Sequence, residues 1–505
     1  MVSFTLSLLI FLPLAGSAVT YAASSLGGGR KVAIYSAVAF SVATLLVSGY
    51  AFWSVYSNTP PLGQYALTES HTWIALPGFT LQFLLGVDGL SAPLILVSSI
   101  LAVLAIVSSK ALIDKNEPAY YALLLFVEGS IMGAFASLNL VVFYVFWELT
   151  LIPIFFLIGV WGGDRRKYAA MKFIIFTFAG SAIMLLGFLA LYLGVSPTTF
   201  DIPDLAGKIP AGLQYLPLLA VFVGFAVELP IFPFHSWQPD AYEQAPAPVN
   251  VLLSGVLPKF AGYGVIRIGI ALFPQAAYQY AWAFIAVAIV SMFYGAVVAL
   301  LQNDLKRMFA YTSINHMGFV LFGAFAAVAS GNPLGIQGAI LLMFTHALSV
   351  GALFTLSGFI EVQAGTRKIS LLGGLTQRMP RTAALLALAS AAAIGIPPFA
   401  SFLAELLVIS AGISAYSYTA ITVLVPVITG AYFLWMLKRT VFDSPAAQAP
   451  EGGVQARDIS RADAGVIVLY LVPLVLLTVF SFLVLSPAAP VAQWTVHLAA
   501  GGAHA

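Results

Sequence analysis

The chain has 505 residues, of which 61 % are apolar and only 8 % are charged, and its mean hydropathy is +0.99. A soluble domain carries roughly 25 % charged residues, so this chain lacks the polar groups needed to cover a water-facing surface. The net charge of +2 comes without any basic tract, which excludes nucleic acid as a partner. The lack of cysteine excludes disulfides, thiol catalysis and cysteine-ligated iron–sulfur clusters within the chain.

Long apolar runs predict an all-α polytopic membrane protein with about fourteen transmembrane helices. A helix needs roughly 20 apolar residues to cross the hydrocarbon core, and lipid requires each backbone amide to be satisfied within its segment. The expected helices cover 3–23, 32–57, 90–109, 118–136, 138–161, 168–195, 214–235, 245–272, 277–301, 306–329, 334–361, 381–413, 415–442 and 463–488. The first run has no basic residues before it, which indicates a transmembrane helix rather than a cleaved signal peptide.

Two segments between the helices are expected to be loops. The segment 58–89 is the longer loop of the N-terminal part, with Trp73 and Phe79 expected at the membrane interface, where aromatic rings are favoured. The segment 443–462 is polar and rich in alanine, proline and glycine. Neither segment suggests a soluble domain.

The positions of lysine and arginine support this count of helices. Positive residues remain in cytoplasmic loops, so they mark alternate connections along the chain. Seventeen of the 21 fall in connections that follow odd-numbered helices: Arg30, Lys31, Lys110, Lys115, Arg165, Arg166, Lys167, Lys306, Arg307, Arg367, Lys368, Arg378, Arg381, Lys438, Arg439, Arg457 and Arg461. Only Lys208 falls in an even-numbered connection, so both termini are expected on the outer face.

Prolines predict breaks inside the seventh and twelfth helices. Pro230 and Pro233 interrupt FAVELPIFPFHSW, and Pro397 and Pro398 interrupt AAAIGIPPFASFLAE, because proline lacks an amide donor and clashes with the preceding turn. The two broken helices lie fourth in two five-helix units of opposite topology, helices 4–8 and 9–13, an arrangement typical of secondary transporters. The expected division of the chain is 1–117 for the first three helices, 118–272 and 273–442 for the inverted repeats, and 443–505 for the polar loop, the last helix and the tail.

Ionisable residues inside these helices are the candidate functional groups. Each costs roughly 3 kcal/mol at the centre of a membrane helix, so a functional role is the default interpretation. The residues expected to form a proton pathway are Glu148, Glu228, His235, Lys259, His316, His346 and Glu405. Burial favours the neutral form of both acids and lysines, so a proton can pass between them at little cost in free energy. No spacing typical of a metal site and no phosphate-binding glycine loop is present.

Other polar residues of the predicted helices and turns could have structural rather than functional roles. Glu128 and Lys172 could form a structural ion pair between the fourth and sixth helices. Asp240 and Glu243 fall where the chain turns, which suits a solvated loop or a helix cap as well as a functional site. His235 lies close to the predicted break of the seventh helix, where it could either pack against neighbouring side chains or relay protons.

Several segments resemble the antiporter-like proton-pumping subunits of respiratory complex I, most of all the type called M in bacteria and chain 4 in organelles. The resemblance runs from LLGVDGLSAPL (85–95) to the end of the thirteenth helix. Its strongest segments are FYVFWELTLIPIFFLIGVWGG (143–163), FPFHSWQPDAYEQAP (232–246), NDLKRMFAYTSINHMGFV (303–320) and FTHALSVGALF (344–354).

The resemblance implies a role for each matching residue. Glu148 corresponds to the family's glutamate of the fifth helix, and Lys259 to the lysine of the eighth helix on a central hydrophilic axis. His316 and His346 correspond to polar residues that connect two half-channels. Glu405 stands where M-type chains have a glutamate and L- and N-type chains have a lysine, and it would release the proton to the outer side.

The chain departs from the family pattern at the seventh helix. Where the family has a lysine just before the proline, this chain has Glu228, within Val227–Pro230. Three consequences are open. Glu148 and Glu228 could share one proton and titrate as a pair, Lys259 could serve as the partner of both, or the input half-channel could be altered or silent. Tyr242, Gln244 and Pro258 differ from many relatives in the same half.

The resemblance implies a proton-translocating subunit of a complex I-like oxidoreductase in a prokaryotic cytoplasmic, organelle inner or thylakoid membrane. Its expected partners are L-, N- and H-type membrane-arm chains and the lipid bilayer. This chain would hold no cofactor, and flavin, iron–sulfur clusters and a quinone-type acceptor would belong to partner subunits. The alternatives are a subunit of a cation/proton antiporter or membrane-bound hydrogenase, and a structural spacer that has lost pumping.

Overall fold

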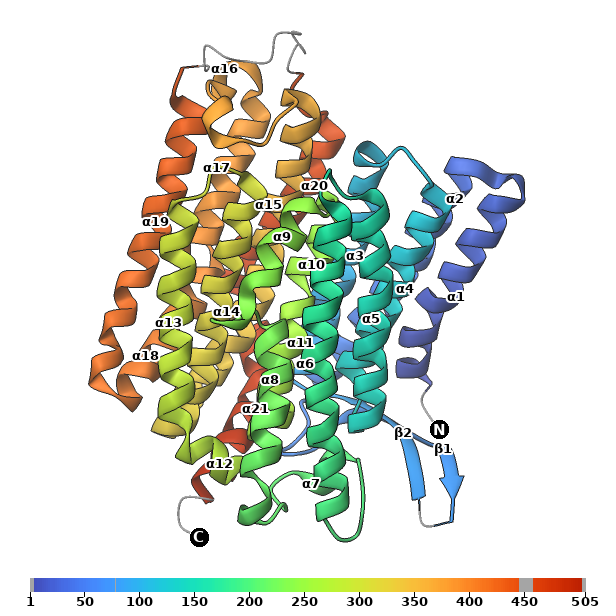
Figure 1. Cartoon of the computed structure of the whole chain (residues 1–505), viewed down its shortest axis with the longest axis vertical. Coiled ribbons are helices and arrows are strands. Elements are labelled where there is room, and N and C mark those ends of the chain that lie inside the picture. The colour runs from blue at the N-terminus through green and yellow to red at the C-terminus, as the bar shows by residue number, and fades with distance from the viewer. Residues whose placement is uncertain (1–3, 78, 445–456, 502–505) are drawn as a thin grey trace.

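The helices of the protein run roughly along its long axis and form a single bundle (Figure 1). The computed structural model describes residues 4–77, 79–444 and 457–501, so most of the predicted polar loop 443–462 lies outside the described residues. α1 begins and α21 ends at the same end of the bundle, as Figure 1 shows.

The elements of the N-terminal half follow one another along the chain as α1 (Thr5–Ala23), η1 (Ser24–Gly28), α2 (Gly29–Ser57), β1 (Ala66–Leu76), β2 (Phe79–Val87), α3 (Ser91–Leu112), α4 (Glu117–Ala136), α5 (Leu140–Trp161), α6 (Arg166–Gly194), α7 (Ile202–Leu205), η2 (Ala211–Leu213), α8 (Tyr215–Glu228), η3 (Phe234–Ser236), α9 (Trp237–Gln244), α10 (Ala247–Gly255), α11 (Leu257–Gly264) and η4 (Val265–Ile270). The C-terminal half contains α12 (Pro274–Gln279), α13 (Ala281–Leu300), α14 (Leu305–Ser330), α15 (Leu334–Ala364), η5 (Ile369–Leu371), α16 (Leu375–Arg378), α17 (Pro380–Ile394), α18 (Ala400–Ala415), η6 (Ser417–Val423), α19 (Leu424–Leu437), η7 (Lys438–Phe442), α20 (Arg461–Val479) and α21 (Phe482–Gly501).

The predicted polytopic helical fold is confirmed. Among the described residues, 12 stretches are long and apolar enough to cross a membrane, and the first of them, Thr5–Ser57, contains both α1 and α2. The shorter apolar helices α8, α17 and α18 belong to the two helices predicted to be broken. The last predicted helix, 463–488, is instead two helices, α20 and α21, and helical structure continues to Gly501. The relation between the two five-helix repeats stays a prediction.

The centre of the bundle is formed by α14, α15 and the stretch α10–η4. Their side chains are almost all buried, whereas α1, α2, α6 and α20 expose much of their apolar surface. Large exposed side chains such as Leu46, Leu186 and Leu216 cover the outside of the bundle. An apolar exterior around a core that holds polar groups is what lipid requires of a membrane protein.

Both predicted breaks are present. α8 ends at Glu228, five residues follow without helical structure, and η3 and α9 continue the chain. α17 ends at Ile394, and α18 starts at Ala400 after Gly395, whose φ of +74° is left-handed. A third break was not predicted: the eighth helix is divided into α10 and α11 at Val256, which has φ −123° and ψ −51°.

The prediction that 58–89 is a loop is wrong, because β1 and β2 form an antiparallel hairpin there. The carboxylate of Glu69 on β1 accepts hydrogen bonds from the backbone N–H groups of Leu6 and Ser7, at 2.7 and 3.0 Å. Glu69 is 1 % exposed and therefore satisfies amides that the start of α1 cannot pair internally. The partner that fixes this hairpin is a helix end more than 60 residues earlier in the sequence, which local pattern cannot reveal.

Candidate functional site: a line of ionisable residues between two broken helices

Four of the predicted residues form a continuous line through the interior. Lys259 Nζ lies 2.7 Å from His346 Nδ1, the rings of His346 and His316 are 5.1 Å apart between centroids, and His316 Nε2 lies 3.5 Å from Glu405 Oε1. The four residues belong to α11, α15, α14 and α18, and none is more than 5 % exposed. Each neighbouring pair is within the reach of a hydrogen bond or of one intervening water.

The break of the eighth helix explains how Lys259 is held. In an uninterrupted helix the carbonyl of Ser254 would accept from the amide of residue 258, but Pro258 has no N–H group. The ammonium of Lys259 donates to this carbonyl instead, at 2.8 Å. The proline next to Lys259 therefore provides a backbone acceptor for a charge that is otherwise fully enclosed.

The hydrogen bond of His316 to the backbone determines its tautomer. His316 Nδ1 lies 2.8 Å from the carbonyl oxygen of Thr312, and a carbonyl can only accept, so Nδ1 carries a proton. In the neutral ring Nε2 is then the acceptor, and it is the atom that faces Glu405. A proton can therefore lie on either side of the His316–Glu405 contact.

The break of the twelfth helix brings the backbone of Gly395 against the carboxylate of Glu405. A Cβ atom at residue 395 would lie 3.0 Å from Oε1 and 3.1 Å from Oε2 of Glu405. The left-handed φ of +74° and this close approach both favour glycine. The broken helix thus holds the last acid of the line between its two halves.

Glu148 and Glu228, the two predicted acids of the first half, are not paired with a cation among the described residues. Glu228 is the last residue of α8 and is 1 % exposed, and neither of its carboxylate oxygens has a hydrogen-bond partner among the described residues. Its carboxylate interacts electrostatically with Glu148, whose side chain lies near Ser181 and Tyr144. In the described part of the chain Lys259 forms no ion pair with either glutamate, so it does not serve as the partner of both.

Tyr242 connects the two groups of residues. It lies close enough to Glu228 for an electrostatic interaction, and its hydroxyl donates to the carbonyl of Leu253 at 2.9 Å. Leu253 precedes Ser254, whose carbonyl holds Lys259. Gln238 lies beside Tyr242, and both of its side-chain polar atoms are without a partner among the described residues.

His235 contacts Tyr294, which lies outside the line from Lys259 to Glu405. Its Nε2 lies 3.1 Å from the hydroxyl of Tyr294 on α13, and its ring stacks on Phe232. Within the described residues no hydrogen bond joins His235 to the line from Lys259 to Glu405. Its part in a proton pathway stays a prediction.

The predicted pair of Glu128 and Lys172 is not present. Glu128 accepts a hydrogen bond from Ser41 at 3.1 Å, whereas Lys172 donates to Asp240 at 2.7 Å. Asp240 also accepts from Arg307 at 2.9 Å. Asp240, in the first turn of α9, therefore joins two cations from α6 and α14, contacts that sequence separation concealed.

Sequence reasoning missed a second buried ion pair. Arg267 of η4 donates to the carboxylate of Asp88, and the two side chains are only 2 % and 4 % exposed. The guanidinium of Arg267 also lies 5.1 Å from the ring centroid of Tyr65 and 5.5 Å from that of Tyr263. The signal available in the sequence was a charged residue inside a predicted helix, but Asp88 is 179 positions away.

No group of three or more His, Cys, Asp or Glu side chains in the described parts of the chain is arranged to hold a metal ion. The line from Lys259 to Glu405 consists of groups that exchange protons, and its ends lie beside the breaks at Val256 and Gly395. The arrangement is chemically suited to passing a proton between two half-channels.

Comparisons with known proteins assign the chain to a family. Residues 137–429 match the family model described as NADH:quinone oxidoreductase/Mrp antiporter, TM. NAD(P)H-quinone oxidoreductase chain 4 1 of Picosynechococcus sp. is 38 % identical over 460 residues, covering 88 % of this chain and 83 % of that protein. F(420)H(2) dehydrogenase subunit M of Methanosarcina mazei is 36 % identical over 447 residues, covering 86 % and 87 %.

A solved structure agrees with these relatives over the whole bundle. A chain of respiratory complex I from Thermus thermophilus superposes with a TM-score of 0.86 at 28 % sequence identity, covering 98 % of this chain and 99 % of that one. The similarity extends beyond the region matched by the family model to the N-terminal helices and α21. The chain therefore belongs to the NADH:quinone oxidoreductase/Mrp antiporter transmembrane family, as an antiporter-like subunit of the M or chain 4 type.

Proposed function

We propose that this chain translocates protons across the membrane as part of a complex I-like oxidoreductase, coupled to electron transfer in partner subunits. The observation that carries the proposal is the series of neighbouring side chains Lys259–His346–His316–Glu405, buried between two broken helices. A structural spacer would gain nothing from four enclosed ionisable side chains, because each one lowers the stability of the membrane-embedded fold.

In this mechanism Lys259 is the central proton store. Protonated Lys259 donates to Ser254 and His346, and deprotonation leaves it neutral in an apolar interior. A change in charge or conformation arriving from a neighbouring subunit at Glu148 and Glu228 drives the proton of Lys259 onto His346. His316 passes it to Glu405, which releases it to the outer side, while Lys259 is reloaded from the cytoplasmic side.

The pair of acids at Glu148 and Glu228 acts as the loading site of the first half. The charge of one carboxylate opposes ionisation of the other, so the two acids respond as a unit to nearby charge. This reading retains a working input half-channel, although Glu228 stands where the family has a lysine.

The proposal also implies the partner subunits, the location of the cofactors and the orientation of the chain in the membrane. The partners are L-, N- and H-type membrane-arm chains, and flavin, iron–sulfur clusters and the quinone-type acceptor belong to other subunits of the complex. The positive connections lie on the cytoplasmic side, so both termini face the outer side of the membrane. The similarity to subunits of both NAD(P)H and F(420)H(2) dehydrogenases indicates that the electron donor is set by partner subunits.

The deciding experiment measures protons pumped per electron in proteoliposomes that contain the assembled complex. Lys259→Ala and Glu405→Ala should each lower this ratio while the complex still assembles and transfers electrons. Lys208→Ala, an exposed lysine outside the line, is the matched control. An unchanged ratio in both variants would refute proton translocation by this chain. The identity of the co-purified subunits separates a complex I-like oxidoreductase from a cation/proton antiporter or membrane-bound hydrogenase.

A further inference from the structure

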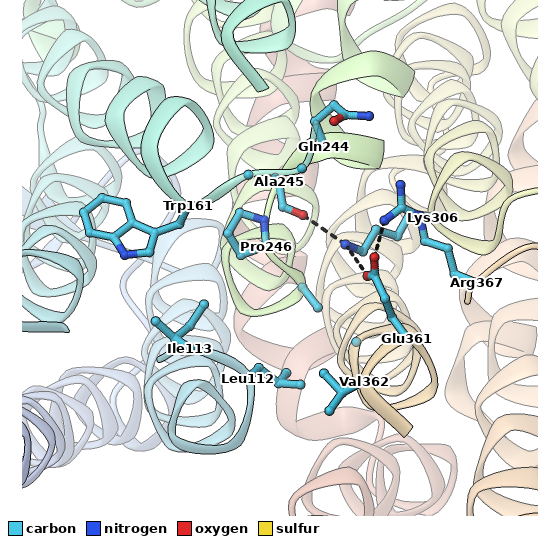
Figure 2. Close-up of a pocket in the computed structure, with 14 residues that line it drawn as sticks. Leu112, Ile113, Trp161, Gln244, Ala245, Pro246, Lys306, Glu361, Val362 and Arg367 are labelled. Atoms are coloured by element: carbon cyan, nitrogen blue, oxygen red, sulfur yellow. Dashed lines mark hydrogen bonds and ion pairs between the residues drawn. The ribbon is translucent and has the colours of Figure 1, made fainter. Parts of the chain in front are cut away.

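A cavity of about 210 Å³ lies at the end of the bundle where α5, α10, α14 and α15 begin or end. Figure 2 shows its two walls. Lys306, Glu361 and Arg367 form a charged wall, and Leu112, Ile113, Trp161 and Val362 form an apolar wall. The volume is large enough for several water molecules.

Lys306 is the most enclosed charge of the cavity. Its side chain is 4 % exposed, and its ammonium lies 3.1 Å from the carboxylate of Glu361 and donates to the carbonyl of Ala245 at 3.2 Å. Glu361 is shared with Arg367, whose Nη1 lies 2.5 Å from it. Figure 2 shows these contacts meeting beside Pro246, where the chain enters α10. A buried lysine held by one shared carboxylate can be released when that carboxylate moves or is protonated.

Polar groups at the start of α10 extend from this cavity in the direction of Lys259. The carbonyl of Ala245, which lines the cavity, also accepts from the side-chain amide of Asn250 at 3.4 Å. Asn250 donates to the carbonyl of Tyr242 at 2.7 Å, and its own side-chain oxygen has no partner among the described residues. From Ala247 in the cavity wall to Ser254, which holds Lys259, α10 rises only about 10 Å.

This path differs from the acidic pair of the first half. The cavity is lined by neither Glu148 nor Glu228, and its charged wall comes from α14, α15 and the connection that follows α15. Lys306 at the start of α14, Arg367 and nearby Lys115 lie in or beside connections that carry the positive residues, which assigns this end to the cytoplasmic side.

We propose that this cavity is a cytoplasmic inlet that supplies protons to Lys259 along α10, by a route that does not pass through Glu148 or Glu228, and that the Lys306–Glu361 ion pair is its gate. The inference rests on the proposed proton-translocating function. With the pair closed, the ammonium of Lys306 repels protons and covers the start of the path. When Glu361 takes up a proton or turns toward Arg367, Lys306 withdraws and water reaches Asn250.

Labelling of an engineered thiol tests whether the cavity is open to water. The chain has no cysteine, so any label found on it reports the introduced residue alone. Ala247→Cys in the cavity wall should react with a small cationic methanethiosulfonate reagent added from the cytoplasmic side. Ala122→Cys, 7 % exposed and outside the cavity lining, should remain unlabelled. An unreactive thiol at 247 overturns the inlet.

A second experiment measures the number of protons pumped per electron in variants of the assembled complex. Labelled Ala247→Cys blocks the inlet and should lose as much pumping as Lys259→Ala, with electron transfer retained. Lys306→Met leaves the inlet without its gate and should lower the ratio because protons can return, whereas Lys306→Arg and the control Lys115→Met should keep it. Labelling of Ala247→Cys should also lower pumping in a complex that carries Glu228→Gln, because the proposed route does not pass through Glu228. If Lys259→Ala lowers pumping but labelled Ala247→Cys does not, the inlet is refuted and the proposed function stands. If Lys259→Ala itself leaves pumping unchanged, the proposed function fails.

Discussion

The ammonium of Lys259 lies 2.7 Å from Nδ1 of His346, although the two residues are 87 positions apart in the sequence. A protonated lysine donates a hydrogen bond to the ring nitrogen, and a proton can be transferred along this bond. The other ring nitrogen of His346 has no partner within the described residues, and His316 is the next ionisable ring. The whole pathway depends on this contact, because it is the first step away from Lys259.

Replacing His346 by leucine should break the line while preserving the packing of α15. Lys259 then loses an acceptor, at a cost of roughly 1–3 kcal/mol in stability, and leucine cannot take up the proton, so the transfer step is lost. We expect fewer protons pumped per electron with assembly intact. His346→Gln, which retains a side-chain acceptor, should bind Lys259 but still not relay protons. Normal pumping in both variants would place the pathway elsewhere.

Glu228→Gln should convert the coupled acidic pair into a single titrating group at Glu148. Since paired carboxylates ionise in two macroscopic steps, the dependence of pumping on pH should simplify to one apparent ionisation in this half. The measurement is the ratio of protons to electrons across a pH series. Asp204→Asn, at an exposed acid, provides the control. Should Glu228→Gln, Glu228→Lys and Lys259→Ala all pump like the parent chain, the structural-spacer alternative is favoured.

Gly395→Ala should impair both stability and proton release. The left-handed backbone costs a non-glycine residue about 1–2 kcal/mol, and the new Cβ would press on the carboxylate of Glu405. Gly331→Ala separates the two effects, because Gly331 has φ +72° with no atom within 4 Å of the added Cβ. Thermal unfolding of the purified complex should report a similar loss for both variants. Only Gly395→Ala should reduce pumping, and equal pumping in the two would show that Glu405 tolerates the contact.

Breaking the Arg267–Asp88 pair should destabilise the chain more than any surface pair. Removing one partner of a buried ion pair leaves an uncompensated charge and costs roughly 3–5 kcal/mol. Asp88→Asn and Arg267→Gln should therefore each lower the unfolding temperature strongly, and the double variant should lose less than the sum. Arg30→Gln breaks the Arg30–Glu117 pair, in which the arginine is 51 % exposed although Glu117 is buried, so the expected loss is smaller than at the fully enclosed Arg267–Asp88 pair. Additive losses at Asp88 and Arg267 would contradict direct coupling.

Local chemistry made several features predictable. Runs of apolar residues can be solvated only by lipid or by one another, and proline cannot donate to a helix, so the membrane helices and the breaks at Pro230 and Pro397 follow from short stretches of sequence. The same reasoning identified Lys259, His346, His316 and Glu405, because a charge inside an apolar run is costly wherever it lies.

The sequence by itself thus determined which groups are enclosed, but only the tertiary structure decided which groups meet. Lys172 pairs with Asp240 rather than Glu128, Asp88 pairs with Arg267, and Glu69 binds the start of α1. The physical reason is that burial is a property of one residue and its neighbours along the chain, whereas a hydrogen bond or ion pair acts over about 3 Å between helices. Its partner is set by packing angles and breaks summed over the whole bundle.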